Sequence, residues 1–260
     1  MSSKSSASTN NERTPSQETE PRKSTRTRKP ARKPIAGTQA RAQTTRKAIL
    51  RAAIKIFAKK GFDGGRIDTI SKASRTHDRM IYYYFGSKEN LFIEVLKTVY
   101  QQMNEEEAKL NLDFSEPVSA LTDLVHFMWH HYLAHPEFLT LLNTENLHQG
   151  KYLKQSGRLQ DLIPPGIAML EEILKKGVEQ GIFRDDIEAR DLYITIASLG
   201  YFYLSNRYTL SAFLDQDVMT EDALNRWRAH ITKVILRSVQ IEAAHQHPEA
   251  CIADNREGAK

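Results

Sequence analysis

The chain has 260 residues, of which 40% are hydrophobic and 27% charged, and its formal net charge is +5. This composition predicts a globular protein with room for one large or two small domains. No run of about 18 apolar residues occurs, and the N-terminus lacks the apolar core of a secretory signal, so neither a membrane span nor export is expected. The single cysteine, Cys251, excludes an intrachain disulfide and fits a reducing compartment, so we expect a cytoplasmic protein.

The charge is unevenly distributed along the chain. Residues 1–90 contain 21 Lys and Arg against 7 Asp and Glu, whereas residues 91–260 contain 16 against 25. A basic front joined to an acidic remainder predicts a polyanionic partner, such as DNA, for the front alone. A basic tail kept for solubility is the weaker interpretation.

Residues 1–42 are poor in apolar side chains and rich in Ser, Thr, Lys, Arg and Pro, so we predict a disordered basic arm. Between Arg22 and Phe62 there are 14 Lys and Arg and no acid. The segment 26–34 is typical either of an arm that enters a DNA minor groove or of a non-specific tether to phosphates. The sequence leaves these two alternatives open.

A helix is predicted from Thr44 to Lys60, because apolar residues recur there with helical period and Gly61 can end it. Its apolar stripe consists of Ile49, Leu50, Ala53, Ile54 and Phe57. Backbone N–H groups at the start of a helix can bind a phosphate. We therefore expect Thr45 and Arg46 to contact DNA.

Two short helices, Arg66–Ser74 and His77–Tyr84, are predicted next, with a polar turn between them. Two helices of this size joined by three or four residues are typical of a helix-turn-helix, whose second helix enters the DNA major groove. Gly86 can end the second helix and Ser87 can cap the following one.

The outward positions of the second helix hold Tyr82 and Tyr83, whereas Ile81 and Tyr84 are expected to pack inside the three-helix unit. The residues predicted to contact DNA are Thr45, Arg46, Arg66, Thr76, His77, Asp78, Arg79, Tyr82, Tyr83 and Lys88.

The strings A-A-x-x-x-F-A-x-x-G-F-D, I-x-x-A-S and I-Y-Y-Y-F-G-S-K-E-x-L-F follow one another between Gln43 and Met103. This stretch resembles the N-terminal domain of the tetracycline-repressor (TetR) family. The turn departs from the family pattern, with Arg75 in place of the usual Gly and His77 in place of Ser or Asn. We expect Arg75 to strain a turn that prefers positive φ and His77 to cap its helix weakly.

The rest of the chain is predicted to form helices only, with Pro and Gly at their ends. The expected helices are Ser87–Leu110, Pro117–Ala134, Pro136–Gln149, Pro164–Gln180, Leu192–Leu204 and Thr220–Ile241. Residues 150–157 are interpreted as a polar break, residues 105–107 as an exposed acidic helix end, and residues 243–260 as a flexible tail.

The segment Leu192–Leu204 is apolar on every face, so both of its sides must be covered. One side can face the core of the domain and the other a second subunit. Together with the long helix Thr220–Ile241, it suits a four-helix bundle between two subunits. The resemblance implies the same arrangement, that of a TetR-type homodimer, and a large monomeric core is the alternative.

The second half also mixes aromatic and neutral polar residues, as small-molecule sites do. The residues predicted to line a ligand pocket are His126, Trp129, His130, Asn143, Asn146 and Tyr201. Ordinary helix packing is the simpler explanation for any one of them.

His126 and His130 are four residues apart, which is the spacing of two zinc ligands on a helix. No Glu follows His126 as a metalloprotease motif requires, and Glu145 or His148 would have to complete the site. We therefore interpret these histidines as core or pocket residues and predict no metal and no cofactor. No catalytic motif is visible, so no enzyme is predicted.

The sequence thus predicts an all-α transcription regulator with four segments. These are an arm (1–42), a helix-turn-helix domain (43–103, with its recognition region at 65–84), a ligand-sensing and dimerisation domain (104–242) and a tail (243–260). The resemblance implies a repressor that a small organic ligand releases from a palindromic double-stranded DNA operator, with no membrane partner. A ligand-independent DNA-binding regulator is the first alternative, and a helical metal-binding protein or enzyme is the second.

Overall fold

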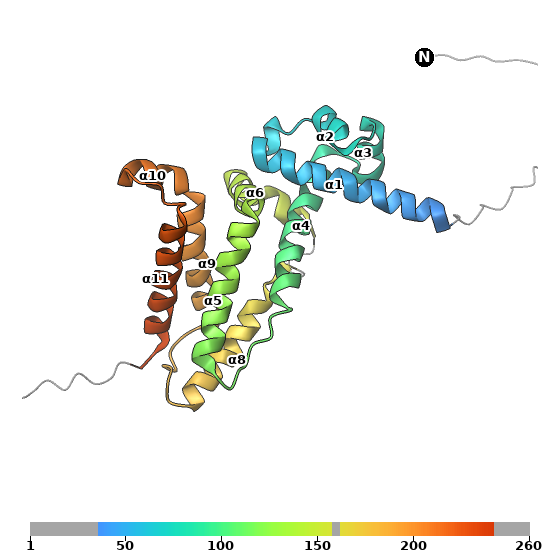
Figure 1. Cartoon of the computed structure of the whole chain (residues 1–260). Helices are drawn as coiled ribbons and strands as arrows, with labels where there is room; N and C mark the ends of the chain where they lie inside the picture. Colours follow the sequence, from blue (N-terminus) through green and yellow to red (C-terminus); the bar gives the residue numbers. More distant parts are fainter. Residues whose placement is uncertain (1–35, 158–161, 242–260) are drawn as a thin grey trace, which may run out of the picture.

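The computed structural model describes residues 36–157 and 162–241, and all regular secondary structure in these ranges is helical (Figure 1). This confirms the predicted all-α fold class. The helices are α1 (Ala36–Gly64), α2 (Ile67–Ser74), α3 (Asp78–Phe85), α4 (Lys88–Glu107), α5 (Pro117–Ala134), α6 (Pro136–Leu147), α7 (Lys151–Gln155), α8 (Pro165–Glu179), α9 (Ala189–Ser205), α10 (Arg207–Leu214) and α11 (Glu221–Val239).

Helices α1, α2 and α3 pack together, α1 and α3 also contact α4, and the three form a small unit at one end of the molecule (Figure 1). Its core contains Ile49 and Phe57 from α1, Ile70 from α2 and Ile81 from α3, all of which are fully buried. These are the apolar positions that recur with helical period in the sequence, so the predicted three-helix unit is confirmed.

Local signals shape the helices of this unit, although Gly61, expected to end the first helix, lies at a kink inside α1, which runs on to Gly64. Gly61 and Gly86 both adopt positive φ, of 68° and 77°, which glycine tolerates without a steric penalty. The Ser87 hydroxyl then accepts a hydrogen bond of 3.0 Å from the backbone N–H of Asn90, which caps α4.

Helix α1 begins earlier than predicted. It starts at Ala36, not Thr44, so residues 36–42 are helical and the prediction of disorder was wrong for them. Periodicity could not reveal this turn of helix, because the extension has few apolar residues. Residues 39–42 are Gln, Ala, Arg and Ala, which have high helix propensity. The remainder of the arm, residues 1–35, and the tail, residues 243–260, lie outside the described residues.

Two short helices were missed. Helix α7 lies inside the segment 150–157 that was interpreted as a polar break, and Tyr152 on it is only 2% exposed. Helix α10 follows α9 after Asn206 and has no buried residue in the described chain. Neither has an apolar stripe long enough to give a clear helical period.

Helix α5 lies at the centre of the second half. It packs against α8, α9 and α11, and its buried face includes Leu121, Leu124 and Met128. Figure 1 shows α9 and α11 side by side on the far side of α5 from α4, with α10 at their upper end. An isolated bridge between Phe183 and Gln240 joins the end of α11 to the segment after α8.

Replacement of Phe92 by Ala tests how the two halves are held together. This buried α4 side chain lies 5.2 Å, centroid to centroid, from the rings of Phe57 and Phe62 and 5.0 Å from that of Tyr152. We expect Phe92→Ala to lower the free energy of unfolding by about 3–5 kcal/mol, because it removes a large buried ring and leaves a cavity. Denaturant unfolding measures this loss. Phe213→Ala on α10, whose side chain is 84% exposed, is the matched control and should change stability by less than about 0.5 kcal/mol.

Candidate nucleic-acid interface and sensor region

The two faces of α3 differ sharply in exposure. Ile81 and Phe85 are buried, whereas Tyr82 is 50% exposed and Tyr83 is 78% exposed. Tyr84 is partly buried against the core. The predicted inward and outward positions of this helix therefore agree with the structure, and α3 presents two neighbouring tyrosines to a partner.

The turn before α3 contains the expected conformation. Arg75 has φ 55° and ψ 41°, the left-handed region in which a residue with a side chain is strained. The turn is held by the Thr76 N–H, which donates to the Ser71 carbonyl at 2.9 Å, and by a 2.9 Å hydrogen bond between the Thr76 and Ser74 hydroxyls. Thr76 is thus a structural part of the turn as well as a predicted DNA contact.

The start of α3 is fastened by Asp78, not by His77. The His77 side chain makes no capping hydrogen bond, as predicted for a weak cap, and it is exposed. The Ser71 hydroxyl donates to the Asp78 carboxylate and so joins α2 to α3. Asp78 also places negative charge in the first turn of α3, which the helix dipole favours.

Two of the basic residues predicted to contact DNA have exposed side chains. Arg79 on α3 is exposed. Arg66 precedes α2 with a side chain that is 75% exposed, and its only described ion pair is with Asp68, at 3.1 Å.

The other three predicted contacts from the helix starts are engaged within the protein. The Thr45 hydroxyl donates to the Arg41 carbonyl at 3.0 Å, one turn earlier. Because α1 starts at Ala36, Thr45 lies well inside the helix, and the prediction that its backbone N–H is free for a phosphate was wrong.

Arg46 and Lys88 each join α1 to α4. The Arg46 guanidinium pairs with Glu94 on α4 and lies 5.0 Å from the ring centroid of Phe85. The Lys88 ammonium donates to the Asp63 carbonyl at 3.2 Å and lies over the ring of Phe62. These contacts stabilise the position of α4 relative to α1, so both side chains have structural roles.

The six predicted pocket residues do not share one pocket. Trp129 is buried and packs against the ring of Tyr203. Asn143 donates to Ser205 at 2.8 Å and accepts from the Tyr201 hydroxyl, which joins α6 to α9.

The other three predicted pocket residues lie elsewhere. His126 lines a groove between α5 and α11, and burial, followed by the nearby Arg228 guanidinium, lowers the pKa of its imidazole. His130 is exposed and lies 3.2 Å from Arg228, and Asn146 is exposed with its amide bonded to the Leu142 carbonyl. The six residues therefore do not form the single ligand pocket that was predicted. Helical spacing shows which residues share a face of a helix, but it does not show which neighbouring helix that face contacts.

Two carboxylates are buried in the second half. Glu107, expected to be exposed at the end of α4, is fully buried and accepts hydrogen bonds from the Gly166 N–H at 2.8 Å and the Tyr193 hydroxyl at 3.3 Å. Burial raises the pKa of its carboxyl group. Glu145 on α6 is 2% exposed, and one of its oxygens accepts from the Leu153 N–H at 2.8 Å.

Tyrosines surround these carboxylates in the interior. Burial, with a further effect of Glu145, raises the pKa of Tyr100 to about 12. Burial also raises the pKa of Tyr132 and Tyr193, and the charge of Glu107 adds to the shift of each. The interior of the second half is therefore both aromatic and polar.

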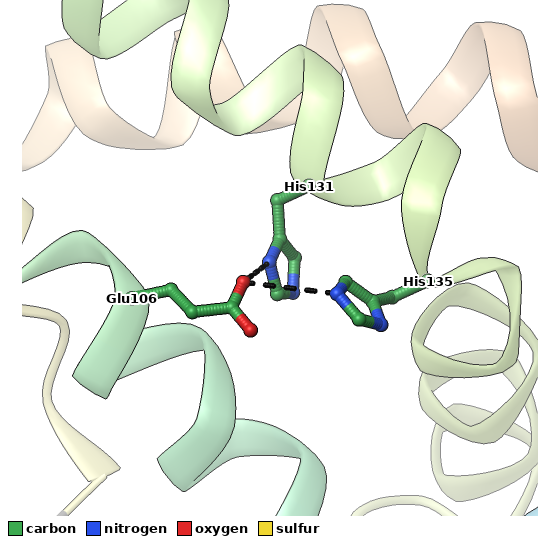
Figure 2. A group of neighbouring side chains, drawn as sticks. All are labelled: Glu106, His131 and His135. Atoms are coloured by element: carbon green, nitrogen blue, oxygen red, sulfur yellow. Dashed lines mark hydrogen bonds and ion pairs between the residues drawn. The ribbon is translucent and has the colours of Figure 1, made fainter.

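A further cluster joins the end of α4 to the end of α5. Figure 2 shows Glu106 facing His131 and His135, which lie one turn apart. Glu106 Oε2 is 2.8 Å from His131 Nδ1 and 3.7 Å from His135 Nε2. One ligand atom from each side chain lies within 4.8 Å of the other two.

The environment of this cluster shifts the pKa of two of its groups. Burial lowers the pKa of the His131 imidazole despite its hydrogen bond to Glu106. Burial acts to raise the pKa of Glu106, but hydrogen bonds from Gln102 and His131 hold it below its ordinary value. The pair considered in the sequence, His126 and His130, has ring centroids 6.3 Å apart and faces α11 instead.

The fold and the exposed face of α3 define the class of protein, an all-helical regulator with an N-terminal helix-turn-helix. Within the described residues no helix is long and apolar enough to cross a membrane. The profile for bacterial regulatory proteins of the tetR family matches residues 49–95, and that for tetracyclin repressor-like C-terminal domains matches residues 117–235.

Known proteins agree with these matches. The chain is 49% identical over 199 residues to the HTH-type transcriptional repressor NicS of Pseudomonas putida, which covers 76% of this chain and 94% of that protein. It is 30% identical over 160 residues to the HTH-type transcriptional repressor SCO4008 of Streptomyces coelicolor. This alignment covers 60% of this chain and 77% of that protein. A HlyIIR mutant structure, at a TM-score of 0.52 and 24% identity over 78% of this chain and 99% of that one, shows the same fold.

The chain therefore belongs to the TetR family, and it is a DNA-binding transcriptional regulator. The resemblance to the TetR family, which rested on the motifs between Gln43 and Met103, is confirmed. The C-terminal half of the chain matches the same family.

Alkaline titration tests the buried tyrosine cluster. A phenol whose pKa is raised by folding contributes stability that is fully present below its unfolded pKa, about 10, and is lost as the pH rises through its folded value. For Tyr100 that window runs from about 10 to about 12. We expect the free energy of unfolding to fall with pH across this window and to fall less steeply in Tyr100→Phe. Denaturant unfolding at several pH values measures both slopes, and equal slopes would contradict the assignment.

Proposed function

We propose that the protein is a homodimeric, one-component repressor that leaves a palindromic operator when a small organic effector binds its second half. The observation that carries this proposal is the paired exposure of Tyr82 and Tyr83 on a helix whose opposite face is locked into the domain core. Operator binding places the protein with the chromosome in the cytoplasm.

Recognition follows from the placement of α3. The second helix of a helix-turn-helix lies in the major groove, where side chains meet base edges and phosphates. Tyr82, Tyr83 and the exposed Arg79 are the groups that α3 offers, and Arg66 is available for a phosphate. A two-fold axis would present two such helices to half-sites about one helical turn apart, or somewhat more.

The outer face of α9 supports the homodimer. Ile194 and Phe202, eight residues apart on this helix, are 55% and 56% exposed, and Val234 on the adjacent α11 is 37% exposed. A second copy placed on this face would bury these apolar side chains through a two-fold axis. Ile231 is 2% exposed in the single chain, so it belongs to the core of its own subunit.

Effector sensing would act through α4. The ligand must bind the DNA-incompetent state more tightly than the DNA-bound state, because otherwise it shifts nothing. The buried tyrosines and carboxylates between α4, α5 and α9 supply polar anchors in an aromatic interior, the mixture typical of small-molecule sites. A ligand-independent regulator is the second candidate, and the contact of Asn143 with Tyr201 and Ser205 favours it, because these side chains already satisfy one another.

Replacement of Tyr83 tests the recognition surface. We expect Tyr83→Ala to weaken binding to a DNA fragment selected from a random library by the wild-type protein. The expected loss is about tenfold or more, or roughly 1.4 kcal/mol, with an unchanged Tm. Tyr208→Ala on α10, whose side chain is 74% exposed, is the matched control and should bind as the wild type does. Equal affinity of the Tyr83 variant and the wild type would show that α3 does not read the DNA as proposed.

A charge in the outer face of α9 and α11 tests the dimer. Phe202→Glu and Val234→Glu should each give monomers and lose tight operator binding, although neither residue is in the helix-turn-helix. Light scattering at micromolar concentration gives the mass, and a DNA-binding assay on the same samples gives the affinity. Val178→Glu is the matched control, because Val178 is also 37% exposed but belongs to α8, not to α9 or α11. A monomeric wild type that binds its operator tightly would overturn the dimer.

A further inference from the structure

Two imidazoles and one carboxylate converge where α4 ends and α5 meets α6. We propose that Glu106, His131 and His135 bind one divalent first-row transition-metal cation of the Zn²⁺ type. The ligand atoms would be Oε2 of Glu106, Nδ1 of His131 and Nε2 of His135 (Figure 2).

The separations of these atoms fit such a cation. Tetrahedral coordination with bonds of about 2.0–2.2 Å places ligand atoms roughly 3.3 Å apart. Glu106 Oε2 lies 2.8 Å from His131 Nδ1 and 3.7 Å from His135 Nε2, on either side of that value. The ring centroids of the two histidines are 4.6 Å apart. The third separation, between the two imidazole nitrogens, is at most 4.8 Å, so side-chain rotation would bring the histidines together around the cation.

The surrounding side chains orient the ligands as outer-shell partners do in known metal sites. The Gln102 amide donates to Glu106 Oε1 at 3.0 Å, which leaves Oε2 to face both imidazoles. Glu137 Oε1 lies 3.4 Å from His135 Nδ1, so it can accept the Nδ1 proton and leave the Nε2 lone pair directed at Glu106. The Gln102 nitrogen also lies 3.4 Å from His135 Nε2, a weaker contact that a cation would replace.

The chemistry of the ligands selects the class of cation. Imidazole nitrogen suits Zn²⁺ and its first-row neighbours, whereas Mg²⁺ and Ca²⁺ prefer oxygen ligands. Among the described ion pairs, Glu106 and Glu137 pair only with histidines, so no Lys or Arg in those pairs competes for the site. His131 is buried, but the side chains of Glu106 and His135 are 36% and 26% exposed, which leaves access for the ion and room for a water ligand.

The position of the cluster gives the cation a structural effect. Glu106 lies in the last turn of α4, His131 in the last turn of α5, and His135 at the junction of α5 and α6. A bound cation would clamp these helix ends together. The consequence for DNA binding rests on the function proposed above, because α4 leads from this cluster to the recognition unit. The binding of the cation itself does not rest on it.

The test uses untagged full-length protein freed of metal by a chelator and studied without DNA. Calorimetric titration with Zn²⁺ should show one saturable site per chain, and Co²⁺ should give the visible absorption of a low-symmetry site with nitrogen ligands. Glu106→Gln and His135→Ala should abolish this binding, and Glu137→Gln should weaken it by about 10–100-fold. Hydrogen exchange gives an independent readout, because Zn²⁺ should slow exchange at the end of α4 in the wild type and not in Glu106→Gln.

The helix itself supplies the matched control. His126 and His130 have the same four-residue spacing on α5 but face α11, so His126→Ala and His130→Ala should bind Zn²⁺ as the wild type does. Circular dichroism of the metal-free proteins identifies a variant that fails to fold, and the part-exposed Glu106→Gln remains informative in that case. Absence of saturable Zn²⁺ binding by the wild type, unchanged binding in both folded ligand variants, or equal affinity for Mg²⁺ would overturn the proposal. Such a result would leave the proposed DNA-binding function standing, because operator binding is measured in a separate assay.

Discussion

The packing of Phe92 against rings from both halves of the chain is the constraint on which the architecture depends. It meets Phe57 and Phe62 of α1 and Tyr152 of α7, and the rings of Phe62 and Tyr152 also contact each other at 4.7 Å. Helix α4 is therefore a shared element of two cores, and burial on several of its faces follows from that position. Close-packed interiors transmit strain because they deform little. A shift of the second half relative to the recognition unit must consequently move α4 as a body or break this contact.

The two ends of α4 are held by different kinds of interaction. At the DNA-binding end, the cations Arg46 and Lys88 lie near aromatic rings and bind partners across α1 and α4, in positions that are partly exposed. At the other end, Glu107 is fully buried and bonded to Gly166. Exposed ion pairs contribute little to stability, whereas an unpaired buried carboxylate costs several kcal/mol. Glu107 is therefore a polar anchor at this end of α4, whereas the buried rings around Phe92 hold the DNA-binding end.

Most of the fold could be predicted from the sequence because its signals are local. Apolar residues at helical period, glycines such as Gly86 and the cap at Ser87 fix where helices run and stop, and the structure agrees with them. The sequence-based predictions failed where a segment has neither a clear helical period of apolar residues nor recognisable capping residues. The extension of α1 to Ala36 has too few apolar residues to show a helical period, and α10 has no buried residue. Tyr152 is buried because α7 meets Phe92 of α4 and Phe62 of α1, and these contacts join segments far apart in the chain.

The candidate sites also differ in whether local sequence or long-range packing determines them. The outward tyrosines of α3 could be identified from the helix itself, because its inward face is defined by residues within the same three-helix unit. The histidines of α5 could not be assigned in this way, since both pairs have identical spacing and only the crossing of α4 decides which pair meets a carboxylate. Residues 105–107 show the reason most directly. A helix turns by about 100° per residue, so three consecutive glutamates must point in three directions. Glu105 is exposed, Glu106 lies at the edge facing His131, and Glu107 is buried in the core. An acidic run therefore fixes the residue types, while the packing of the helix fixes which acid is solvated, which can bind an ion and which anchors the fold.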